Sequence, residues 1–299
     1  MSALLLLFAC LALGALVARF FKPPQGLAQY LNWWVINIAL PALVLDLIPR
    51  IHFDPQLWFL AVAQWLVFIG AWALFALLGP RLGWSRGRIG ALILVTGLGN
   101  TSFMGYPLLE ALRGKDGLAL AVVADQLGCF VMLAVGGVAV TAVFAGRKLM
   151  PEEIARRILL FPSFLALVAG IVVGVLGGWP DALHQVLERV GATLTPLALF
   201  SVGLQFRLHL GRSQLGALGL GLGWKLLLAP LLCWGLGLAL GVHGLVLTVG
   251  VLQAAMAPMI SAAILADQYG LEPPLANTVL GVGILLSLVT VPLANMLFQ

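Results

Sequence analysis

The sequence predicts an all-α polytopic membrane protein with ten transmembrane helices, arranged as two inverted five-helix repeats whose fourth and ninth helices are broken and cross. Three observations lead to this prediction. Of the 299 residues, 62% are hydrophobic and 9% are charged, whereas a soluble domain carries about 25% charged residues. Apolar runs of about 20 residues, the length that crosses a bilayer core, fill almost the whole chain. Two of these runs are interrupted near their middles, at matching places in the two halves.

Ten apolar runs define the predicted helices. The first run lacks a basic leading region and a small-residue cleavage site, so we expect a retained helix rather than a signal peptide. The first five-helix repeat is predicted over residues 1–148 and the second over residues 149–299. The ten predicted spans are Ser2–Phe20, Leu27–Leu47, Leu57–Leu78, Arg88–Leu112, Leu118–Phe144, Ile158–Gly177, Ala182–Gly203, Gln214–Leu240, Leu245–Ala266 and Pro274–Leu297.

Basic residues in the loops predict how the chain is oriented. Because cytoplasmic loops carry the excess of Lys and Arg, we expect a multi-pass protein of the cell (inner) membrane with both termini outside the cytoplasm. The formal charge of +5 then reflects loops that face anionic lipid, and no nucleic-acid partner is expected. The predicted cytoplasmic side holds Arg19, Lys22, Arg81, Arg86, Arg88, Arg147, Lys148, Arg156, Arg157, Arg207 and Arg212, and the other side holds Arg50, Arg113 and Lys115.

The two halves of the chain echo each other in sequence. The stretch Ala39–Leu45 of the second span resembles Leu194–Phe200 of the seventh, and their prolines, Pro41 and Pro196, lie 155 residues apart. The same offset superposes the fourth span on the ninth and the fifth on the tenth. Five spans is an odd number, so a repeated unit must enter the membrane upside down. Chance similarity between apolar sequences is the alternative, and the shared proline register and break positions favour the repeat.

The two interruptions fall near the centre of the bilayer. Asn100 lies about 12 residues into the fourth span, which is roughly 18 Å at 1.5 Å per residue. Pro258 reaches a similar depth from the opposite side. Backbone leaves the helical form inside a bilayer only where protein or a wet cavity covers it, and paired breaks of this kind mark ligand sites in secondary transporters.

The residue types in the two breaks suit ligand binding. Proline frees the carbonyl four residues earlier, and glycine lowers the cost of unwinding. Thr101 or Ser102 can cap the half-helix that follows. A helix N-terminus favours an anion, whereas freed carbonyls favour a cation. The predicted substrate-binding residues are Asn100, Thr101, Ser102, Gln126, Gln253, Ala255 and Pro258, and the predicted crossover or hinge residues are Gly99, Gly105, Pro107, Pro41 and Pro196.

Asp125 and Lys225 are the deepest ionisable residues of the predicted spans. Their levels differ by only a few ångströms at 1.5 Å per residue, so an intramembrane ion pair is geometrically possible. An unpaired charge at bilayer depth costs at least ~3 kcal/mol. Three interpretations stay open: a structural ion pair, a Lys225 ammonium that receives a substrate carboxylate, and an Asp125 carboxyl that exchanges a proton during transport.

Several patterns argue against other function classes. The sequence contains no nucleotide-binding glycine loop, zinc motif or catalytic triad, so we expect no cofactor, no metal site and no enzyme activity. The cysteines lie in apolar runs without paired spacing, which favours a packing role. Charged residues near span ends are expected at the surface, because their side chains can reach the interface. The cysteines are Cys10, Cys129 and Cys233, and the charged residues are Asp46, Glu110, Arg189 and Asp267.

Four motifs together resemble the auxin efflux carrier superfamily, which holds the plant PIN proteins and bacterial permeases assigned to malate or malonate. Gly99–Leu108 looks like the family's fourth-helix motif, and Ala254–Pro258 followed by Ala262–Tyr269 is similar to its ninth-helix motif. Asp125–Gly128 and Lys225–Pro230 resemble its fifth and eighth helices. The likeness covers the whole chain.

The resemblance implies a fold and a mechanism. Helices one, two, six and seven would form a scaffold, and the others a transport domain whose fourth and ninth helices cross at the substrate. It also implies elevator-like alternating access and a homodimer. By position, Asn100 would contact a substrate carboxylate, Gln126 would lie in the neighbouring polar site and Pro258 would mark the crossover. In one departure from the family pattern, the first break has no proline at its centre, and Pro107 follows a few residues later.

These observations predict a secondary transporter, or uniporter, of a small organic anion, and we expect this anion to be a carboxylate. One alternative is a sodium-coupled organic anion symporter of the bile-acid-transporter type, with freed carbonyls and Gln253 as ligands. A non-transporting membrane sensor and a channel are others. An intramembrane enzyme is disfavoured, because Ser102 has no histidine near it in sequence. Proton or sodium coupling stays open.

Overall fold

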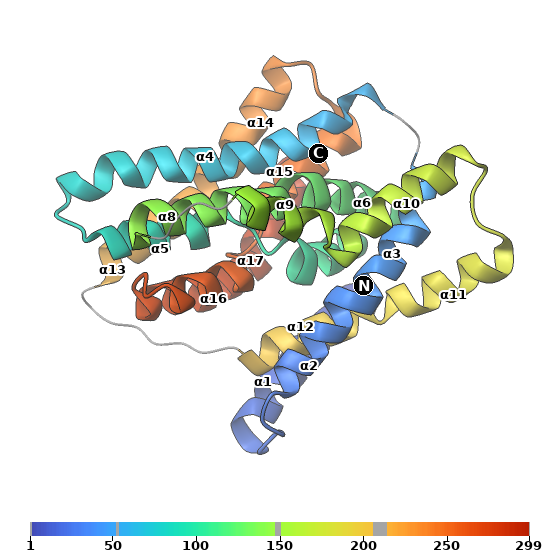
Figure 1. Ribbon diagram of the computed structural model, residues 1–299, viewed down its shortest axis with the longest axis horizontal. Coiled ribbons are helices and arrows are strands. Elements are labelled where there is room, and N and C mark those ends of the chain that lie inside the picture. The colour runs from blue at the N-terminus through green and yellow to red at the C-terminus, as the bar shows by residue number, and fades with distance from the viewer. Residues whose placement is uncertain (1, 52–53, 147–150, 206–213, 299) are drawn as a thin grey trace. The chain divides into compact units, whose positions relative to one another are not determined.

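The computed structural model describes residues 2–51, 54–146, 151–205 and 214–298, and within these ranges every regular element is a helix (Figure 1). The predicted all-α fold class is therefore confirmed for the described part of the chain. Four of the basic residues that predicted the orientation lie outside the described residues, namely Arg147, Lys148, Arg207 and Arg212.

Many of the helices are long and apolar enough to cross a membrane. Six candidate spans meet that standard in the described ranges, and three shorter apolar helices accompany them. The prediction of a multi-pass membrane protein is confirmed, while the count of ten spans and the inverted repeat stay predictions. The six spans are Leu27–Arg50, Pro55–Arg81, Thr101–Ala145, Asp181–Gln205, Leu215–Ala239 and Pro273–Leu297, and the shorter helices are Leu5–Phe20, Pro162–Val175 and Gly244–Ala254.

The helices pack as two compact units, and each unit takes residues from both halves of the chain. The first unit comprises Met1–Asp54, Ser102–Val122 and Ala155–Phe206, and the second comprises Pro55–Thr101, Val123–Ile154 and Arg207–Gln299. The first unit contains α1 (Ser2–Phe20), α2 (Leu27–Trp34), α3 (Leu40–Leu47), nearly all of α6 (Tyr106–Val123), the end of α9 (Pro151–Leu159), α10 (Pro162–Val175), α11 (Asp181–Ala192) and α12 (Leu194–Gln205). The second contains α4 (Trp58–Arg81), α5 (Arg86–Gly97), α7 (Phe130–Met132), α8 (Val138–Ala145), α13 (Leu215–Gly223), α14 (Ala229–Ala239), α15 (Gly244–Ala254), α16 (Ile260–Gln268) and α17 (Pro273–Leu297).

Three prolines are each preceded by a short π-helical segment. Proline cannot donate to the carbonyl four residues earlier, and its ring clashes with that carbonyl. A π turn widens the helix at that point and relieves the clash while the rest of the helix continues. The widened turn also changes the direction of its own side chains. The segments are Val35–Ala39, Thr101–Gly105 and Trp224–Leu228, and the prolines that follow them are Pro41, Pro107 and Pro230.

The core of the second unit is built from rings set against glycines. Phe68 of α4 packs on Gly97 and on Gly136, where an added Cβ would lie under 3.0 Å from the phenyl ring.

At the start of α5, Arg88 forms a bidentate ion pair with Glu272, the N-cap of α17, with N–O distances of 2.7 and 2.9 Å. These contacts fix α5 between α4 and α17, and α5 carries the first interruption at its end.

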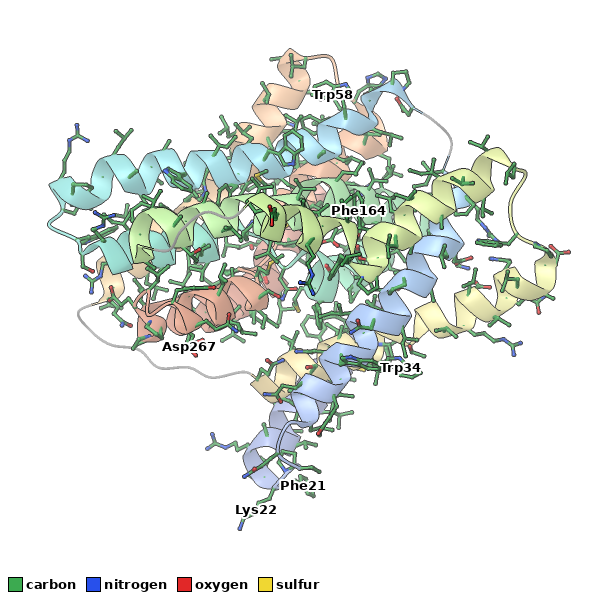
Figure 2. The ribbon with its side chains drawn as sticks, viewed as in Figure 1. Phe21, Lys22, Trp34, Trp58, Phe164 and Asp267 are labelled. Atoms are coloured by element: carbon green, nitrogen blue, oxygen red, sulfur yellow. The ribbon has the colours of Figure 1, made fainter. Side chains whose placement is uncertain are left out.

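The outer surfaces of both units are rich in large apolar side chains, which stand away from the helices in Figure 2. Val175 and Leu176 at the end of α10 are among the most exposed of them. Trp58, the first residue of α4, is also exposed, as an interfacial tryptophan would be. An apolar exterior around a partly polar interior is the arrangement that a lipid environment requires.

In the first unit, α1 and α12 touch at two glycines. A Cβ on Gly14 would lie under 3.0 Å from the carbonyl oxygen of Phe200, and a Cβ on Gly203 equally close to that of Leu11. Small residues let membrane helices approach until their backbones are in contact, which maximises van der Waals attraction where lipid removes the hydrophobic driving force. This contact joins the first helix of the chain to a helix of its second half.

We expect Gly203→Ala to lower the free energy of unfolding by about 1–3 kcal/mol, because the added methyl group must push two backbones apart. Gly219→Ala is the matched control, since Gly219 is exposed on α13 and no side chain or other helix lies within 4 Å of its Cβ position, and alanine favours a helix over glycine. Tryptophan fluorescence during heating in detergent would measure both. Equal melting temperatures for the two variants would contradict the close contact.

Candidate functional site

The two predicted interruptions meet in the second unit. α5 ends at Gly97 and α15 ends at Ala254, and the chain beyond each forms an isolated antiparallel bridge between Gly99 and Pro258. The backbone N–H of Asn100 donates to the carbonyl of Ala257 at 2.7 Å. The N–H of Met259 donates to the carbonyl of Leu98 at 3.0 Å. Two N–H groups and two carbonyl groups of the broken helices are thus paired with the opposite break.

Pro258 occupies a position in this bridge where the missing N–H of proline does not remove a hydrogen bond. Gly99 and Pro258 face each other as the non-hydrogen-bonded pair, because their chain neighbours make both bonds. The missing N–H of proline is therefore not needed. Its ring packs on Gly283 of α17, where an added Cβ would overlap the Cδ and Cγ atoms of the ring.

Asn100 lies at the centre of the crossing and is only 3% exposed. Its backbone is held by Ala257, yet its side-chain Nδ2 has no hydrogen-bond acceptor among the described residues. A buried donor without a partner costs about 1–3 kcal/mol of free energy. Native structures keep few such groups, and each calls for an explanation such as a ligand or a water molecule.

A polar chain continues from Asn100 to the fifth predicted span. The hydroxyl of Thr101 donates to Oδ1 of Asp125, and Nε2 of Gln126 donates to Oδ2 of the same carboxylate at 2.9 Å. Gln253 of α15 donates from Nε2 to the carbonyl oxygen of Thr101 at 3.3 Å. All four side chains are buried. The structure thus brings Asn100 together with these four predicted site residues.

Lys225 lies on the other flank of the break. Its Nζ donates to the carbonyl oxygen of Ala254 at 3.0 Å, at the end of α15. Gly99 stays in an ordinary backbone conformation, and a Cβ there would lie 3.0 Å from Nζ of Lys225. Glycine at position 99 therefore leaves room for the ammonium group and does not serve a left-handed turn. The ion pair between Asp125 and Lys225 stays a prediction.

Of the remaining predicted site residues, one contributes only backbone groups to the second break, and the others lie in the first unit. Ala255 is buried in the second break, where its N–H caps α15 by donating to the carbonyl of Val251. Ser102, Gly105 and Pro107 belong to the first unit. Pro41 and Pro196 also belong to the first unit, near the starts of α3 and α12.

Sequence reasoning missed three contributors to this region. Cys129, expected only to pack, donates from Sγ to the carbonyl of Gly99 at 3.2 Å. It follows Asp125 by four residues, so the two share a helix face, and that spacing could have revealed it. Gln64 of α4 and Trp224 are also buried, and neither Nε2 of Gln64 nor Nε1 of Trp224 has an acceptor within the described ranges. Among the described residues of the second unit, three buried side-chain N–H donors therefore lack an acceptor, on Gln64, Asn100 and Trp224.

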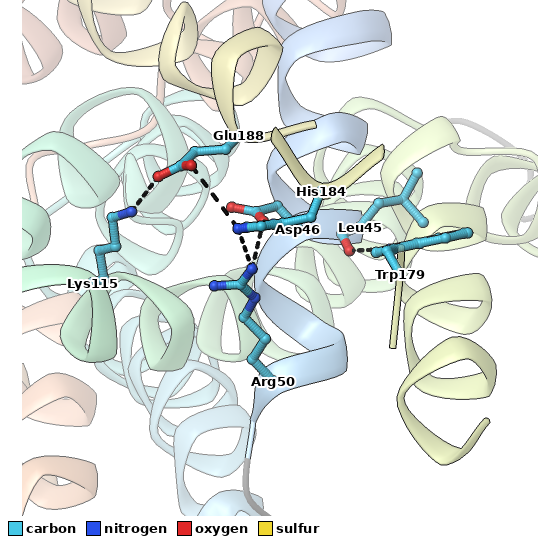
Figure 3. A network of polar contacts seen from close by, with 7 residues as sticks. All are labelled: Leu45, Asp46, Arg50, Lys115, Trp179, His184 and Glu188. Atoms are coloured by element: carbon cyan, nitrogen blue, oxygen red, sulfur yellow. Dashed lines mark hydrogen bonds and ion pairs between the residues drawn. The ribbon is translucent and has the colours of Figure 1, made fainter. Parts of the chain in front are cut away.

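A separate charged cluster lies in the first unit (Figure 3). His184 of α11 brings Nδ1 to 2.6 Å from Oδ1 of Asp46, an ion-pair distance without hydrogen-bond alignment. Arg50 contacts Nε2 of His184, and Lys115 pairs with Glu188. The cluster ties α3 to α11 and α11 to the chain at Lys115.

The burial of Asp46 shows that one prediction was wrong. Its place near a span end predicted a surface carboxylate, but it is only 5% exposed and is covered by His184. Beside it, the ring N–H of Trp179 donates to the carbonyl of Leu45 at 2.8 Å. Depth along a span does not reveal which neighbours cover a side chain, and both covering residues come from the other half of the chain.

Broken helices around buried polar groups, in an otherwise apolar multi-pass protein, are typical of one class of protein, the membrane transporters. The chain matches the family model described as "Membrane transport protein" over residues 2–294 and belongs to that family. This match confirms the resemblance to the auxin efflux carrier superfamily. The protein is therefore a membrane transporter and not an enzyme.

Relatives in two prokaryotes cover nearly the same length. A protein of Methanothermobacter thermautotrophicus named "Uncharacterized transporter" is 27% identical over 268 residues, which is 89% of this chain and 87% of the relative. A protein of Rhizobium meliloti named "Putative malonate transporter" is 28% identical over 299 residues, 95% of this chain and 91% of the relative. Both names place these relatives among transporters.

We expect Thr101→Val to lower the free energy of unfolding by about 1–3 kcal/mol, because it removes a donor from the buried carboxylate of Asp125 without changing the side-chain volume. Thr96→Val is the matched control: Thr96 is equally buried and only donates to the carbonyl of Leu92 in its own helix. Thermal unfolding would measure both, and Thr101→Ser should restore stability. A loss as large at position 96 as at position 101 would argue against the polar chain.

Proposed function

We propose that the protein is a secondary transporter of a small organic anion of the carboxylate class, and that the anion binds at the crossing. The observation that carries this proposal is the buried Nδ2 of Asn100, which has no acceptor among the described residues and lies between the two breaks. A carboxylate oxygen would accept from it. Hydrogen bonds to a charged acceptor contribute about 1.5–3 kcal/mol.

The excess of donors in the second unit supports an anion over a neutral solute. Gln64 and Trp224 each add a buried N–H group that lacks an acceptor within the described ranges. The Rhizobium meliloti relative is named for malonate, so we propose small dicarboxylates as the first class to test.

We further propose that the chain forms ten spans as two inverted repeats, covering residues 1–148 and 149–299. The order of helices supports this. A shift of 155 residues, the distance from Pro41 to Pro196, carries α1 onto α10 and the α2–α3 segment onto α11 and α12. The same shift carries α4 onto α13 and α14, and α5 onto α15. An odd number of spans in each repeat would invert the second one.

We propose elevator-type alternating access, in which the second unit carries the site and the first is the scaffold. The division into two units supports this in part, because the second unit holds the bridge between Gly99 and Pro258, whereas α1, α2, α10, α11 and α12 belong to the first, together with nearly all of α6. The rest of the proposal follows the family resemblance: a homodimer in the inner membrane, with both termini outside the cytoplasm.

Two alternatives remain as competing proposals. A sodium-coupled symporter would use the freed carbonyl of Ala254 and the side chain of Gln253 as ligands for the ion. A membrane sensor would bind the anion and transport nothing. Replacement of sodium by choline during uptake tests the first, and comparison of binding with flux in liposomes tests the second.

In proteoliposomes we expect saturable uptake and counterflow of labelled malonate or a related dicarboxylate. Asn100→Ala should reduce uptake about tenfold to a hundredfold, the equivalent of one hydrogen bond to a charged group. It should also abolish the rise in melting temperature that the anion gives the unmodified protein.

Asn37→Ala is the matched control. Asn37 lies in the first unit and donates from Nδ2 to the carbonyl of Trp33 in its own helix, so its loss should leave uptake unchanged. Unimpaired uptake by a folded Asn100→Ala variant would remove the proposed site. Anion-dependent stabilisation without any flux would favour the sensor.

A further inference from the structure

We infer that α9, the short helix Pro151–Leu159, lies in the plane of the membrane surface and binds anionic lipid headgroups there. The chain passes from the second unit to the first within this helix, between Ile154 and Ala155. The inference needs no substrate, so it stands apart from the proposed transport function.

The residues of α9 divide into an apolar face and a polar face. At about 100° per residue, Ile154, Ile158 and Leu159 fall within an arc of about 140°. Glu152 and Arg156 lie beyond that arc, and both are exposed. A helix with such a one-sided pattern is stabilised when its apolar stripe packs on another apolar surface.

α9 needs such a surface because it is short. Isolated helices of fewer than about 12–15 residues are marginal in water, and α9 has nine residues. Ile154 and Ile158 are half-buried, but Leu159 is 57% exposed and Leu160, the next residue, is 63% exposed. Within the described part of the chain, the apolar face is therefore only partly covered.

The uncovered end of this face continues into the apolar surface of α10. Phe161 is extended, with φ −74° and ψ 125°, because proline at position 162 disfavours a helical conformation in the residue before it. Beyond this turn, Leu165 and Val168 of α10 are 52% and 48% exposed. Exposed apolar side chains on a helix of a multi-pass protein face the acyl chains of the lipid.

The length of α9 places it along the membrane surface. Nine residues make a helix of about 14 Å, which is too short to cross a hydrocarbon core of about 30 Å. An amphipathic helix next to a membrane span instead buries its apolar face about 5–10 Å deep, at the boundary between headgroups and acyl chains. Lipid is therefore the partner that covers the apolar face of α9.

The distribution of charge along α9 favours anionic lipid. Glu152 and Glu153 stand in the first turn, whereas Arg156 and Arg157 stand in the last turn, next to apolar α10. The positive end of the helix is thus the end that adjoins the membrane. Arginine keeps its apolar stem against lipid while its guanidinium group reaches a phosphate. Both arginines also belong to the predicted cytoplasmic side, where the leaflet carries anionic lipids.

The test measures hydrogen exchange of the α9 backbone amides in the full-length protein, with one copy per nanodisc. The discs contain phosphatidylcholine alone or phosphatidylcholine mixed with phosphatidylglycerol. We expect exchange to be slower than in an unstructured peptide in both lipids, and slower again with phosphatidylglycerol. Arg156→Gln should reduce this additional slowing about fivefold, which corresponds to about 1 kcal/mol for one arginine near an anionic surface.

Arg189→Gln is the matched control. Arg189 is an exposed arginine of α11 in the first unit, so its loss should leave the exchange of α9 unchanged in both lipids. Ile158→Gln should speed the exchange of α9 in both lipids, because it places a polar group on the apolar face. Ile158→Leu keeps that face apolar and should retain the protection.

Three results would overturn the inference. The first is exchange of α9 at the rate of an unstructured peptide in both lipids, and the second is equal exchange of the unmodified protein in the two lipids. The third is protection that appears only in discs with two copies, because a second copy of the chain would then cover the face. Failure to bind or transport any carboxylate would reject the proposed function and leave the exchange result unaffected.

Discussion

The structure depends on one constraint: peptide groups that leave a helix inside an apolar medium must find partners within the protein. Gly99 and Pro258 meet that constraint jointly. Asn100 donates to Ala257 and Met259 donates to Leu98, so the two breaks satisfy each other. Neither break would be tolerable alone, because each would leave buried donors and acceptors unpaired. The crossing is therefore a single element made from two distant pieces of sequence.

Most helices and both breaks were predictable from the sequence, because apolar length and the placement of proline and glycine are local signals. The second predicted span, Leu27–Leu47, for example, lies within the helical stretch Leu27–Arg50 and starts at the same residue. The π-helical turns were not predicted. Proline indicated where a helix would be disturbed, as at Pro41, but the same proline in a sequence is compatible with a kink or with a widened turn.

The candidate site was partly predictable for the same reason. Polar residues inside apolar spans are few, so Asn100, Asp125, Lys225 and Gln253 stood out, and the structure places all four in one unit. Their partners did not stand out. That Lys225 meets a carbonyl of α15, and that Asp46 lies under His184 in the first unit, depends on contacts between remote segments. Such contacts arise from packing, which no single stretch of sequence encodes.

The contact between Gly14 and the backbone of α12 has a consequence for biogenesis. α1 is synthesised long before α12, so the face of α1 that carries Gly14 has no α12 to pack against while most of the chain is made. The first unit can close only after the ribosome has delivered most of the second half of the chain. The first unit is therefore completed late, by docking of helices from both halves of the chain, rather than by folding of one half and then the other.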